Sequence, residues 1–393
     1  MIRLAVIFES SPFDRKGLFN AVHNRVKHLL EAGGFELDVY CVHSRDNMFT
    51  RHVRHTPVTP DVDKVNIEGV GYSILWYRFS IIDHILLEKF GRRPILFDGF
   101  MKRTVSLLEG YDAVLAHSFT GGLLAYEASQ TYGMPYFVTW HGSDVHTHPW
   151  RVPVILEDTR AIMRNASCNF FVSNALKDFS DRIAEDACKH VLYNGVSDSF
   201  IRFPEDARME ARRRFGLANA EKSVSFAGNL AAVKNVRVLA PLFRRISELY
   251  DGNLKFLIAG DGRLRAAVES DMASSGIDVR FFGNLSPEEM PAFMNSTDVL
   301  VLPSLNEGLP LVCAEALRCG ANVVGSDVGG IAEVVGKDNV FPLDSGFVDA
   351  AAARAVQMLR EVVVQDVPSE FDWSVTASKE AAFLRELEAF RKP

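Results

Sequence analysis

The chain lacks the patterns that mark several large protein classes. No run of about 18 apolar residues occurs among its 393 residues, which argues against a transmembrane helix. The five cysteines are scattered without a Cys-x-x-Cys pair, so we expect free thiols in a reducing cytoplasm and no bound metal. The sequence also contains no internal repeat and no low-complexity segment. These absences argue against membrane-spanning, disulfide-rich and repeat architectures.

Basic charge is also scarce. The 43 Lys and Arg residues are outnumbered by 50 Asp and Glu, which gives a net charge of −7 and no argument for a nucleic-acid partner. The balance is +2 over residues 1–110 and −9 over the remainder, which is weak support for contact with anionic lipid. The N-terminal MIRLAVIFES is too short and too acidic for a secretory signal and is predicted to form a strand. We expect a cytoplasmic protein.

What the sequence does contain is a repeated alternation of strands and helices. In the first half, strands are predicted at 4–8, 37–42, 113–117, 136–140, 169–172 and 190–193, and helices at 18–32, 119–132 and 174–186. The pattern pauses at 194–206, the predicted linker, and resumes with strands at 223–227, 255–259, 278–282, 299–302, 322–325 and 339–341, separated by helices of 10–15 residues. This alternation predicts two α/β domains, each a doubly wound parallel sheet with ligands at the carboxyl ends of its strands.

Residues 298–335 are the most informative segment. They predict a buried strand, a loop that contains Glu307, and a helix that opens near Pro310 and contains Glu315. A strand that leads into a helix N-terminus leaves several backbone N–H groups unpaired, which favours an anion there. Carboxylates beside such a site accept hydrogen bonds from hydroxyl groups. The alternative is that both acids are solvated, but the neighbours of Glu315 are apolar. The segment therefore predicts a ligand that carries phosphate and hydroxyl groups.

Two other turns carry candidate residues. Gly228 lies in the turn after the first strand of the second domain, and Lys234 is predicted at the start of the next helix, an arrangement suited to a diphosphate. The alternative is an ordinary strand–turn–helix with a solvated lysine. His141 follows the strand 136–140 directly and stands beside Gly142, where it can reach into a cleft. A lone histidine at such a place is otherwise structural.

Glu307 and Glu315 form a Glu-x7-Glu pair that is followed by a GGxxE segment over 329–333, and residues 141–144 read HGSD. In these motifs the chain resembles the retaining glycosyltransferases of family 4. The resemblance implies the GT-B fold, in which two Rossmann-like domains face each other across a cleft. Residues 1–198 would then bind the acceptor and 199–373 the nucleotide sugar, while a last helix within 374–393 would cross back to the first domain.

The resemblance also implies roles for particular residues. The nucleotide-sugar site would comprise Gly228, Asn229, Lys234, Gly260, Gly283, Glu307, Gly308, Leu309, Leu311 and Glu315. Within it, Glu315 would hold the ribose hydroxyls and Glu307 the hydroxyls of the transferred sugar. The groups at the reacting centre would be His141, Lys234 and Glu307. Many family members carry arginine where Asn229 stands, so the leaving diphosphate would have one cation fewer here.

The acceptor side is predicted from Gly17, Arg15, Lys16 and Asp144. The opening loop departs from the family's Gly-Gly loop and is closer to that of enzymes that build bacterial surface polysaccharides. Arg15 and Lys16 could meet an acidic acceptor or be solvated, and Asp144 could instead cap the following turn. Residues 75–108, with interspersed aromatic and basic side chains, fit either a membrane-surface segment or a pair of amphipathic helices on the sheet.

The expected function is transfer of a sugar, with retention and without a metal or cofactor, from a UDP- or GDP-sugar to a hydroxyl of a glycan or lipid-linked acceptor. A bacterial capsule, exopolysaccharide or cell-wall glycan is the expected product, made at the inner face of the plasma membrane. Two alternatives stay open. One is a catalytically silent subunit that binds a nucleotide sugar, and the other is an epimerase or hydrolase on the same fold.

Overall fold

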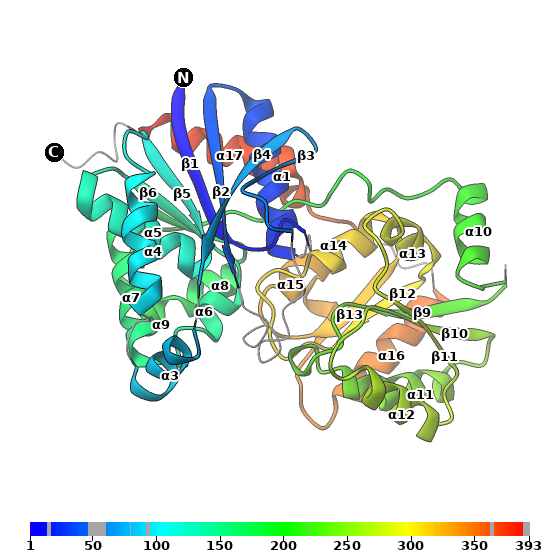
Figure 1. Cartoon of the computed structure of the whole chain (residues 1–393). Coiled ribbons are helices and arrows are strands. Elements are labelled where there is room, and N and C mark those ends of the chain that lie inside the picture. Colours follow the sequence, from blue (N-terminus) through cyan, green and yellow to red (C-terminus); the bar gives the residue numbers. More distant parts are fainter. Residues whose placement is uncertain are drawn as a thin grey trace. The chain divides into compact units, whose positions relative to one another are not determined.

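The computed structural model describes residues 1–13, 17–45, 60–78, 80–91, 95–218, 220–361 and 365–387 (Figure 1). The chain divides into two compact units. The first consists of Met1–Asn194 together with Asp372–Pro393, and the second of Gly195–Phe371. The second unit is thus inserted into the first, and a hydrogen bond from the Val196 N–H to the Phe371 carbonyl (2.8 Å) joins its two ends.

An eight-stranded sheet forms the centre of the first unit, in the order β3-β4-β2-β1-β5-β6-β7-β8. Its strands are β1 (Ile2–Glu9), β2 (Phe35–Ser44), β3 (Lys64–Ile67), β4 (Val70–Tyr77), β5 (Ala113–His117), β6 (Tyr136–Trp140), β7 (Cys168–Phe171) and β8 (Lys189–Val191). All neighbours pair in parallel except β3 and β4. Strands β5 and β6 are buried along their whole length, which explains their continuous apolar sequences.

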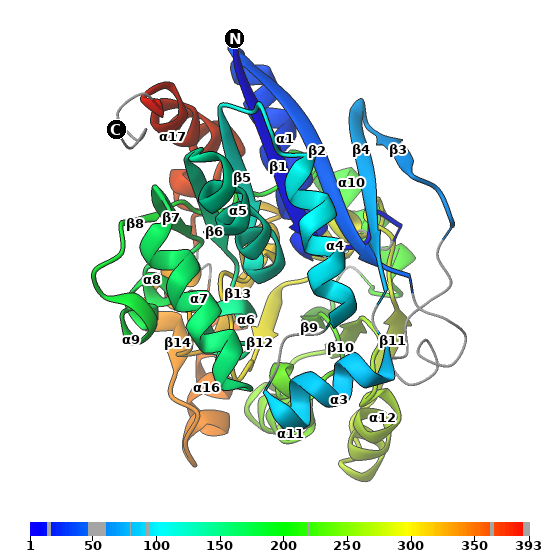
Figure 2. The same cartoon turned by 60° about the vertical axis from the view of Figure 1, so that its left-hand side comes forward.

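Helices cover both faces of this sheet, as Figures 1 and 2 show. They are α1 (Gly17–Ala32), α3 (Ile81–Phe90), α4 (Ile95–Ser106), α5 (Ser118–Tyr132), α6 (Ser143–His146), α7 (Pro153–Asn165), α8 (Asn174–Phe179), α9 (Asp181–Ala184) and, from the C-terminal segment, α17 (Trp373–Arg385). Helices α1 and α17 lie together on one face, and α4, α5 and α7 lie on the other. The expected doubly wound α/β class is confirmed for this unit.

The structure of this unit differs from the sequence predictions in two places. The hairpin β3–β4 was not predicted, although Glu68 and Gly69 form its turn with φ of 50° and 87°, the conformation that a tight hairpin requires. Residues 75–77 accordingly end a strand and do not begin a helix. The single helix predicted at 174–186 is two short helices, because the chain breaks at Ser180, whose Oγ donates to the Lys177 carbonyl.

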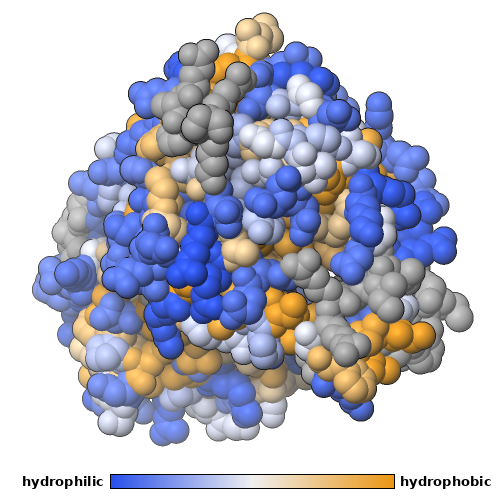
Figure 3. All heavy atoms as spheres, turned by 90° about the vertical axis from the view of Figure 1, so that its left-hand side faces the viewer, coloured by the Kyte–Doolittle hydropathy of each residue, from blue (hydrophilic) through white to orange (hydrophobic). Residues whose placement is uncertain are grey.

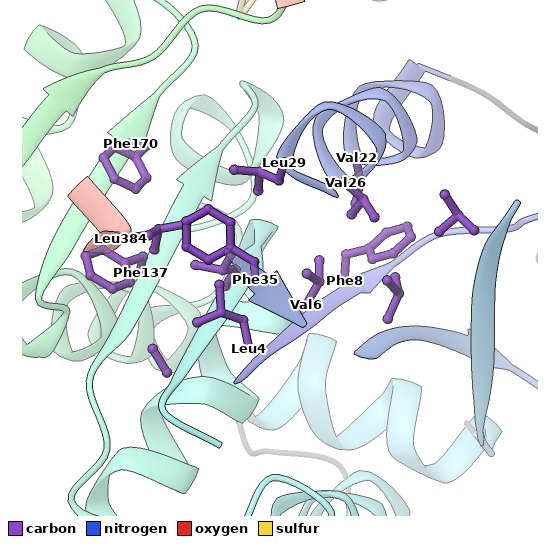
Figure 4. Close-up of a cluster of buried hydrophobic side chains, with 14 of the residues drawn as sticks. Leu4, Val6, Phe8, Val22, Val26, Leu29, Phe35, Phe137, Phe170 and Leu384 are labelled. Atoms are coloured by element: carbon purple, nitrogen blue, oxygen red, sulfur yellow. The ribbon is translucent and has the colours of Figure 1, made fainter. Parts of the chain in front are cut away.

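The main core of the first unit packs α1 and α17 against the sheet. Figure 4 shows Val22, Val26 and Leu29 of α1 and Leu384 of α17 directed toward the apolar side chains of the strands. Side chains from the N-terminal strands and from the C-terminal helix are therefore buried in the same cluster. This burial fixes the last helix to the first unit.

A buried ion pair lies at the same interface. Arg25 of α1 and Glu380 of α17 are each 1% exposed, and the Nε and Oε2 atoms are 3.5 Å apart. The Arg25 guanidinium also donates to Thr139 Oγ1 (2.8 Å) and to the Leu192 carbonyl (3.3 Å). Burial raises the pKa of Glu380 and lowers that of Arg25, because it disfavours the charged form of each group. Removal of either partner would leave an uncompensated charge in the core.

The second unit contains a six-stranded parallel sheet in the order β11-β10-β9-β12-β13-β14. Its strands are β9 (Lys222–Ala227), β10 (Leu254–Ala259), β11 (Val279–Gly283), β12 (Val299–Leu302), β13 (Asn322–Ser326) and β14 (Val340–Phe341). Its α-helices are α10 (Glu205–Arg214), α11 (Leu239–Leu249), α12 (Arg265–Ser274), α13 (Met290–Ser296), α14 (Leu311–Arg318), α15 (Ile331–Val335) and α16 (Phe347–Arg360). Single 3₁₀ turns occur at Ala232–Lys234, Val236–Val238, Lys337–Asn339 and Ser369–Phe371.

The doubly wound class is confirmed here too, with α11 and α16 on one face of the sheet and α13 and α14 on the other (Figure 1). Helices α13, α14 and α15 are shorter than the expected 10–15 residues, with 7, 8 and 5 residues. The loop between β12 and α14 spans residues 303–310, and it confirms the loop predicted there. This loop carries Glu307.

Hydrophilic residues predominate on the face shown in Figure 3, with smaller hydrophobic areas between them. No helix in the described part of the chain is both long and apolar enough to span a bilayer. Of the two helices expected within 75–108, α4 buries Phe100, Met101 and Val105. On α3, by contrast, the described side chains of Ile82 and Phe90 are exposed.

Candidate active site

Three glycines, Gly228, Gly260 and Gly283, lie at the carboxyl ends of β9, β10 and β11, and Gly260 among them lacks room for a side chain. The Gly228 N–H donates to the Ala259 carbonyl, and the Gly260 N–H donates to the Gly283 carbonyl (2.6 Å). A Cβ atom on Gly260 would lie 1.9 Å from the Gly228 carbonyl oxygen. All three glycines have φ between 66° and 152°, where L-residues are disfavoured. These predicted donor-site glycines therefore hold adjacent turns in close contact.

Asn229 follows Gly228 on the same edge, and its side chain is exposed. Its Oδ1 lies so close to Gly262 that a Cβ there would approach it to 2.4 Å. Its backbone N–H has no hydrogen-bond partner among the described residues. Asn229 can thus offer a neutral backbone donor to a ligand, but it brings no cation to the position where arginine was expected.

Lys234 lies in the first 3₁₀ turn after β9 and not at the start of α11, which begins at Leu239. The predicted position of Lys234 at the start of a helix was wrong, because Asn235 adopts a left-handed conformation with φ of 50° and interrupts the helix. The preceding Val233 carbonyl accepts a hydrogen bond from the Leu305 N–H (2.8 Å). This contact joins the lysine turn to the loop after β12.

Lys234 and Glu307 form the central contact of the site. The Nζ and Oε1 atoms are 2.6 Å apart, with side-chain exposures of 23% and 10%. Ser304 Oγ donates to the same Oε1 (2.6 Å), and Ser326 Oγ donates to the Ser304 carbonyl (2.6 Å). Both serines are fully buried. The buried serines therefore fix the Glu307 carboxylate beside Lys234, although the two residues are 73 apart in sequence.

Sequence reasoning missed the two serines. The available signal was Ser304 three residues before Glu307, a spacing at which a hydroxyl commonly bonds within a turn. Ser326 gave no signal, because its contact depends on the pairing of β12 with β13.

The Gly-Gly turn after β13 supports the same loop from the other side. The Gly330 N–H donates to the Gly308 carbonyl (3.1 Å). Gly329 has φ of 53°, and a Cβ there would lie 1.8 Å from the Glu307 carbonyl oxygen. The GGxxE segment therefore contributes close backbone packing behind Glu307.

The N-terminus of α14 offers free backbone donors next to Glu307. The N–H groups of Gly308, Leu309 and Leu311 have no hydrogen-bond partner among the described residues, and Pro310 has no N–H. The positive end of the α14 dipole lies at the same place and also favours an anion. The arrangement can bind an anion by backbone hydrogen bonds without a metal.

Glu315 lies one turn into α14 and is half-buried. Its carboxylate has no hydrogen-bond partner or ion pair within the described ranges. Burial raises the pKa of this carboxyl to about 7. A carboxylate that is desolvated and lacks a protein donor is suited to accept hydrogen bonds from ligand hydroxyls.

His141 lies in the first unit, directly after β6, and its ring is paired with that of His117 at the end of β5 (Nδ1 of His117 to Nε2 of His141, 3.1 Å). Burial and the nearby Arg25 charge lower the pKa of His141 to about 3. Asp144 is buried, and its carboxylate accepts the N–H groups of His141 and Gly142 at 2.7–3.1 Å. Asp144 thus shapes the loop that presents His141.

The remaining acceptor-side residues are placed only in part. Gly17 is the first residue of α1, and a Cβ there would meet no atom within 4 Å. Arg15 and Lys16 lie outside the described residues. Whether these two basic side chains meet an acidic acceptor or are solvated therefore stays a prediction with two alternatives.

One group in the described part of the chain has the ligand types of a metal site. Cys168, Cys188 and His190 bring their Sγ and ring nitrogen atoms within 4.8 Å of one another. They lie at the amino ends of β7 and β8, the edge of the first sheet opposite to His117 and His141. The donor-site residues include no such group, and the absence of a metal from the reaction stays a prediction.

Two family models match the chain. The model described as glycosyl transferases group 1 matches residues 207–362, and the glycosyl transferase 4-like domain matches residues 20–195. Together they cover every candidate residue described above except Arg15, Lys16 and Gly17. The chain belongs to the group 1 glycosyltransferases.

Curated relatives of this glycosyltransferase include proteins of archaea and bacteria. MJ1607, an uncharacterized glycosyltransferase of Methanocaldococcus jannaschii, is 25% identical over 285 residues, which cover 69% of this chain and 70% of the relative. TuaC of Bacillus subtilis, a putative teichuronic acid biosynthesis glycosyltransferase, is 28% identical over 58% of this chain. That match spans 56% of TuaC, little more than half of its length.

Solved structures confirm the fold. Sucrose-phosphate synthase from Thermosynechococcus elongatus superposes with a TM-score of 0.76 at 18% identity, covering 99% of this chain and all of the other. HepE from Anabaena, in complex with UDP and glucose, gives 0.72 at 15% identity, with 97% and 99% covered. The glycosyltransferase therefore has the predicted GT-B fold.

The close packing of the Gly-Gly turn generates a stability prediction for this glycosyltransferase. Gly329→Ala should destabilise the second unit by at least about 3 kcal/mol, because its Cβ would overlap the Glu307 carbonyl and strain the backbone. Gly276→Ala is the matched control, since Gly276 also has positive φ (69°) but has no atom within 4 Å of a Cβ. The control should lose only about 1–2 kcal/mol. Denaturant unfolding measures both, and equal losses would contradict the packing argument.

The raised pKa of Glu315 predicts a pH-dependent cost to folding. The folded protein holds the Glu315 proton more tightly than the unfolded chain, whose carboxyl has a pKa near 4.5, so stability should fall as pH rises from about 4.5 to about 7. Glu315→Gln should remove this loss, stabilising the protein by up to about 3 kcal/mol at pH 8 and not at pH 4.5. The exposed Glu370→Gln serves as control. An equal effect of Glu315→Gln at both pH values would contradict the prediction.

Proposed function

We propose that this glycosyltransferase transfers a sugar from a nucleoside diphosphate sugar, with UDP as the expected nucleotide, to a hydroxyl group of a glycan or lipid-linked acceptor. The observation that carries the proposal is the Lys234–Glu307 pair, which places a cation and a hydrogen-bond acceptor 2.6 Å apart beside the free N–H groups of α14. A diphosphate requires the cation and the N–H donors. A sugar hydroxyl requires the carboxylate.

Glu315 extends the same site toward a nucleoside. Its unpaired carboxylate can accept hydrogen bonds from the two ribose hydroxyls, and these hydrogen bonds offset the cost of its burial. The two acids would then bind opposite ends of the donor, with the diphosphate at the helix N-terminus between them. HepE was solved with UDP and glucose, which supports UDP as the first nucleotide to test.

The proposed chemistry is electrostatic. Negative charge develops on the leaving diphosphate, and Lys234 with the N-terminus of α14 would stabilise it by groups already oriented before reaction. Retention at the anomeric carbon, with the acceptor hydroxyl losing its proton to the departing phosphate, requires no protein nucleophile and no metal. His141 would contact the transferred sugar as a neutral imidazole, consistent with its pKa of about 3.

The acceptor is proposed to belong to a bacterial surface polysaccharide. The match to TuaC, whose name refers to teichuronic acid biosynthesis, supports this class of product. Peripheral contact with an anionic membrane is supported by the exposed Ile82 and Phe90 on α3. The acceptor screen should therefore compare soluble glycans with lipid-linked sugars in anionic vesicles, and equal transfer to both would remove the membrane from the proposal.

The first test is nucleotide binding. UDP at about 100 times its dissociation constant should stabilise the protein by about 2.7 kcal/mol, measured as a shift in Tm, and GDP and ADP are compared at the same concentration. Glu315→Ala should abolish the shift, because the ribose hydroxyls lose their acceptor. The exposed Glu370→Ala should retain it. No shift with any nucleotide would count against the donor site itself.

A second test separates catalysis from binding. Lys234→Ala should lower kcat by about 100-fold while changing nucleotide affinity less, since its charge acts mainly on the departing diphosphate. Lys337→Ala, an exposed lysine of the same unit, should leave turnover unchanged. Donor turnover in Lys234→Ala equal to that of the wild type would refute the role, and a wild type that binds UDP without turnover would favour the silent subunit.

A further inference from the structure

His117, which is buried, and His141, which is half-buried, form a pair in the first unit, and His117 is not part of the family motif. His117 ends β5 and His141 follows β6, and these strands are parallel neighbours with His117 in register with Thr139. The rings are 5.4 Å apart between centroids and tilted by 32°, with His117 Nδ1 and His141 Nε2 at 3.1 Å. That distance is a hydrogen bond between two imidazoles.

Such a hydrogen bond requires that one imidazole nitrogen donates and the other accepts. If His117 Nδ1 carries the hydrogen, His141 must carry its own on Nδ1. If His141 Nε2 carries it, His117 must carry its own on Nε2. In either case the tautomer of one ring fixes that of the other, and a protonated ring would place positive charge beside the buried guanidinium of Arg25.

The surroundings hold both rings in place. His117 is 2% exposed, with Phe8 edge-on at 6.4 Å. Arg25 donates to Thr139 Oγ1, two residues before His141, and Asp144 accepts the His141 N–H. Ser118, next to His117, has φ of 61°, a strained conformation for a residue with a side chain. Burial, and to a lesser extent the charges of His141 and Arg25, lowers the pKa of His117 well below its ordinary value, so the pair stays neutral.

We propose that His117 is a positioning residue for sugar transfer: through its Nδ1 contact it holds the His141 ring in one tautomer and one orientation. The nitrogen that His141 offers to the donor sugar is then either always a hydrogen-bond donor or always an acceptor. The inference rests on the proposed function only in naming the sugar as the group that His141 meets. The coupling between the tautomers of the two rings follows from the pair alone.

Two substitutions separate hydrogen bonding from volume. His117→Asn keeps an amide atom near the position of Nδ1 that can donate or accept, whereas His117→Ala removes the contact. His117→Ala should lower kcat by about 10- to 100-fold, the range seen when partners that orient a functional imidazole are removed, with KM for the donor changed less than threefold. His117→Asn should recover most of kcat. Thr131→Ala, at an exposed position near the end of α5 in the same unit, is the control and should match the wild type.

A spectroscopic measurement tests the tautomer without any assay of transfer. In protein labelled with ¹⁵N-histidine, the ring nitrogens of His141, assigned with a His141→Gln variant, should show one tautomer in the wild type and in His117→Asn. In His117→Ala they should show a mixture. A single unchanged tautomer in His117→Ala, or wild-type kcat in that variant, would overturn the proposal. Failure of the wild type to turn over any nucleotide sugar would instead count against the proposed function, and the spectra would still decide the role of His117.

Discussion

Parallel strand pairing is the constraint on which both units depend. Because β9, β10, β12 and β13 run in one direction, their carboxyl ends meet at one edge, and the loops that follow them share a small region. This arrangement brings together the loops that carry Lys234 and Glu307. In the first unit the same constraint brings His117 and His141 together from adjacent strands. Strand pairing thus places the functional residues near one another, and side-chain contacts such as the Lys234–Glu307 ion pair then hold them.

Burial and neighbouring groups fix the electrostatic surroundings of the side chains at these edges. Glu307 is ion-paired with Lys234 and accepts a hydrogen bond from a buried serine, whereas Glu315 has no donor among the described residues and has a pKa raised to about 7. His117 and His141 share one hydrogen bond and stay neutral next to Arg25. In each unit the fold thus sets the hydrogen bonds and the electrostatic surroundings of these side chains before any ligand binds. Such preorganisation is what a reaction with a charged leaving group requires.

The sequence predicted the strands better than the turns. Continuous apolar runs such as 113–117 and 136–140 identified buried parallel strands to the residue, because both faces of such strands are covered. The hairpin β3–β4 escaped prediction, since a four-residue edge strand such as KVNI has no strong pattern. The broken helix start at Asn235 was also missed, because one residue with positive φ decides it. The family motifs located Glu307 and His141, but the residues that hold them, Ser304, Ser326 and His117, depend on strand pairing that a sequence pattern does not display.

The insertion of the second unit into the first has a consequence for synthesis of the chain. Two segments connect the units, one after Asn194 and one before Asp372, and the hydrogen bond from the Val196 N–H to the Phe371 carbonyl joins them where they enter the second unit. The core of the first unit includes Leu384 and Leu387 from the C-terminal segment. This core can therefore be completed only after the whole of the second unit has been synthesised.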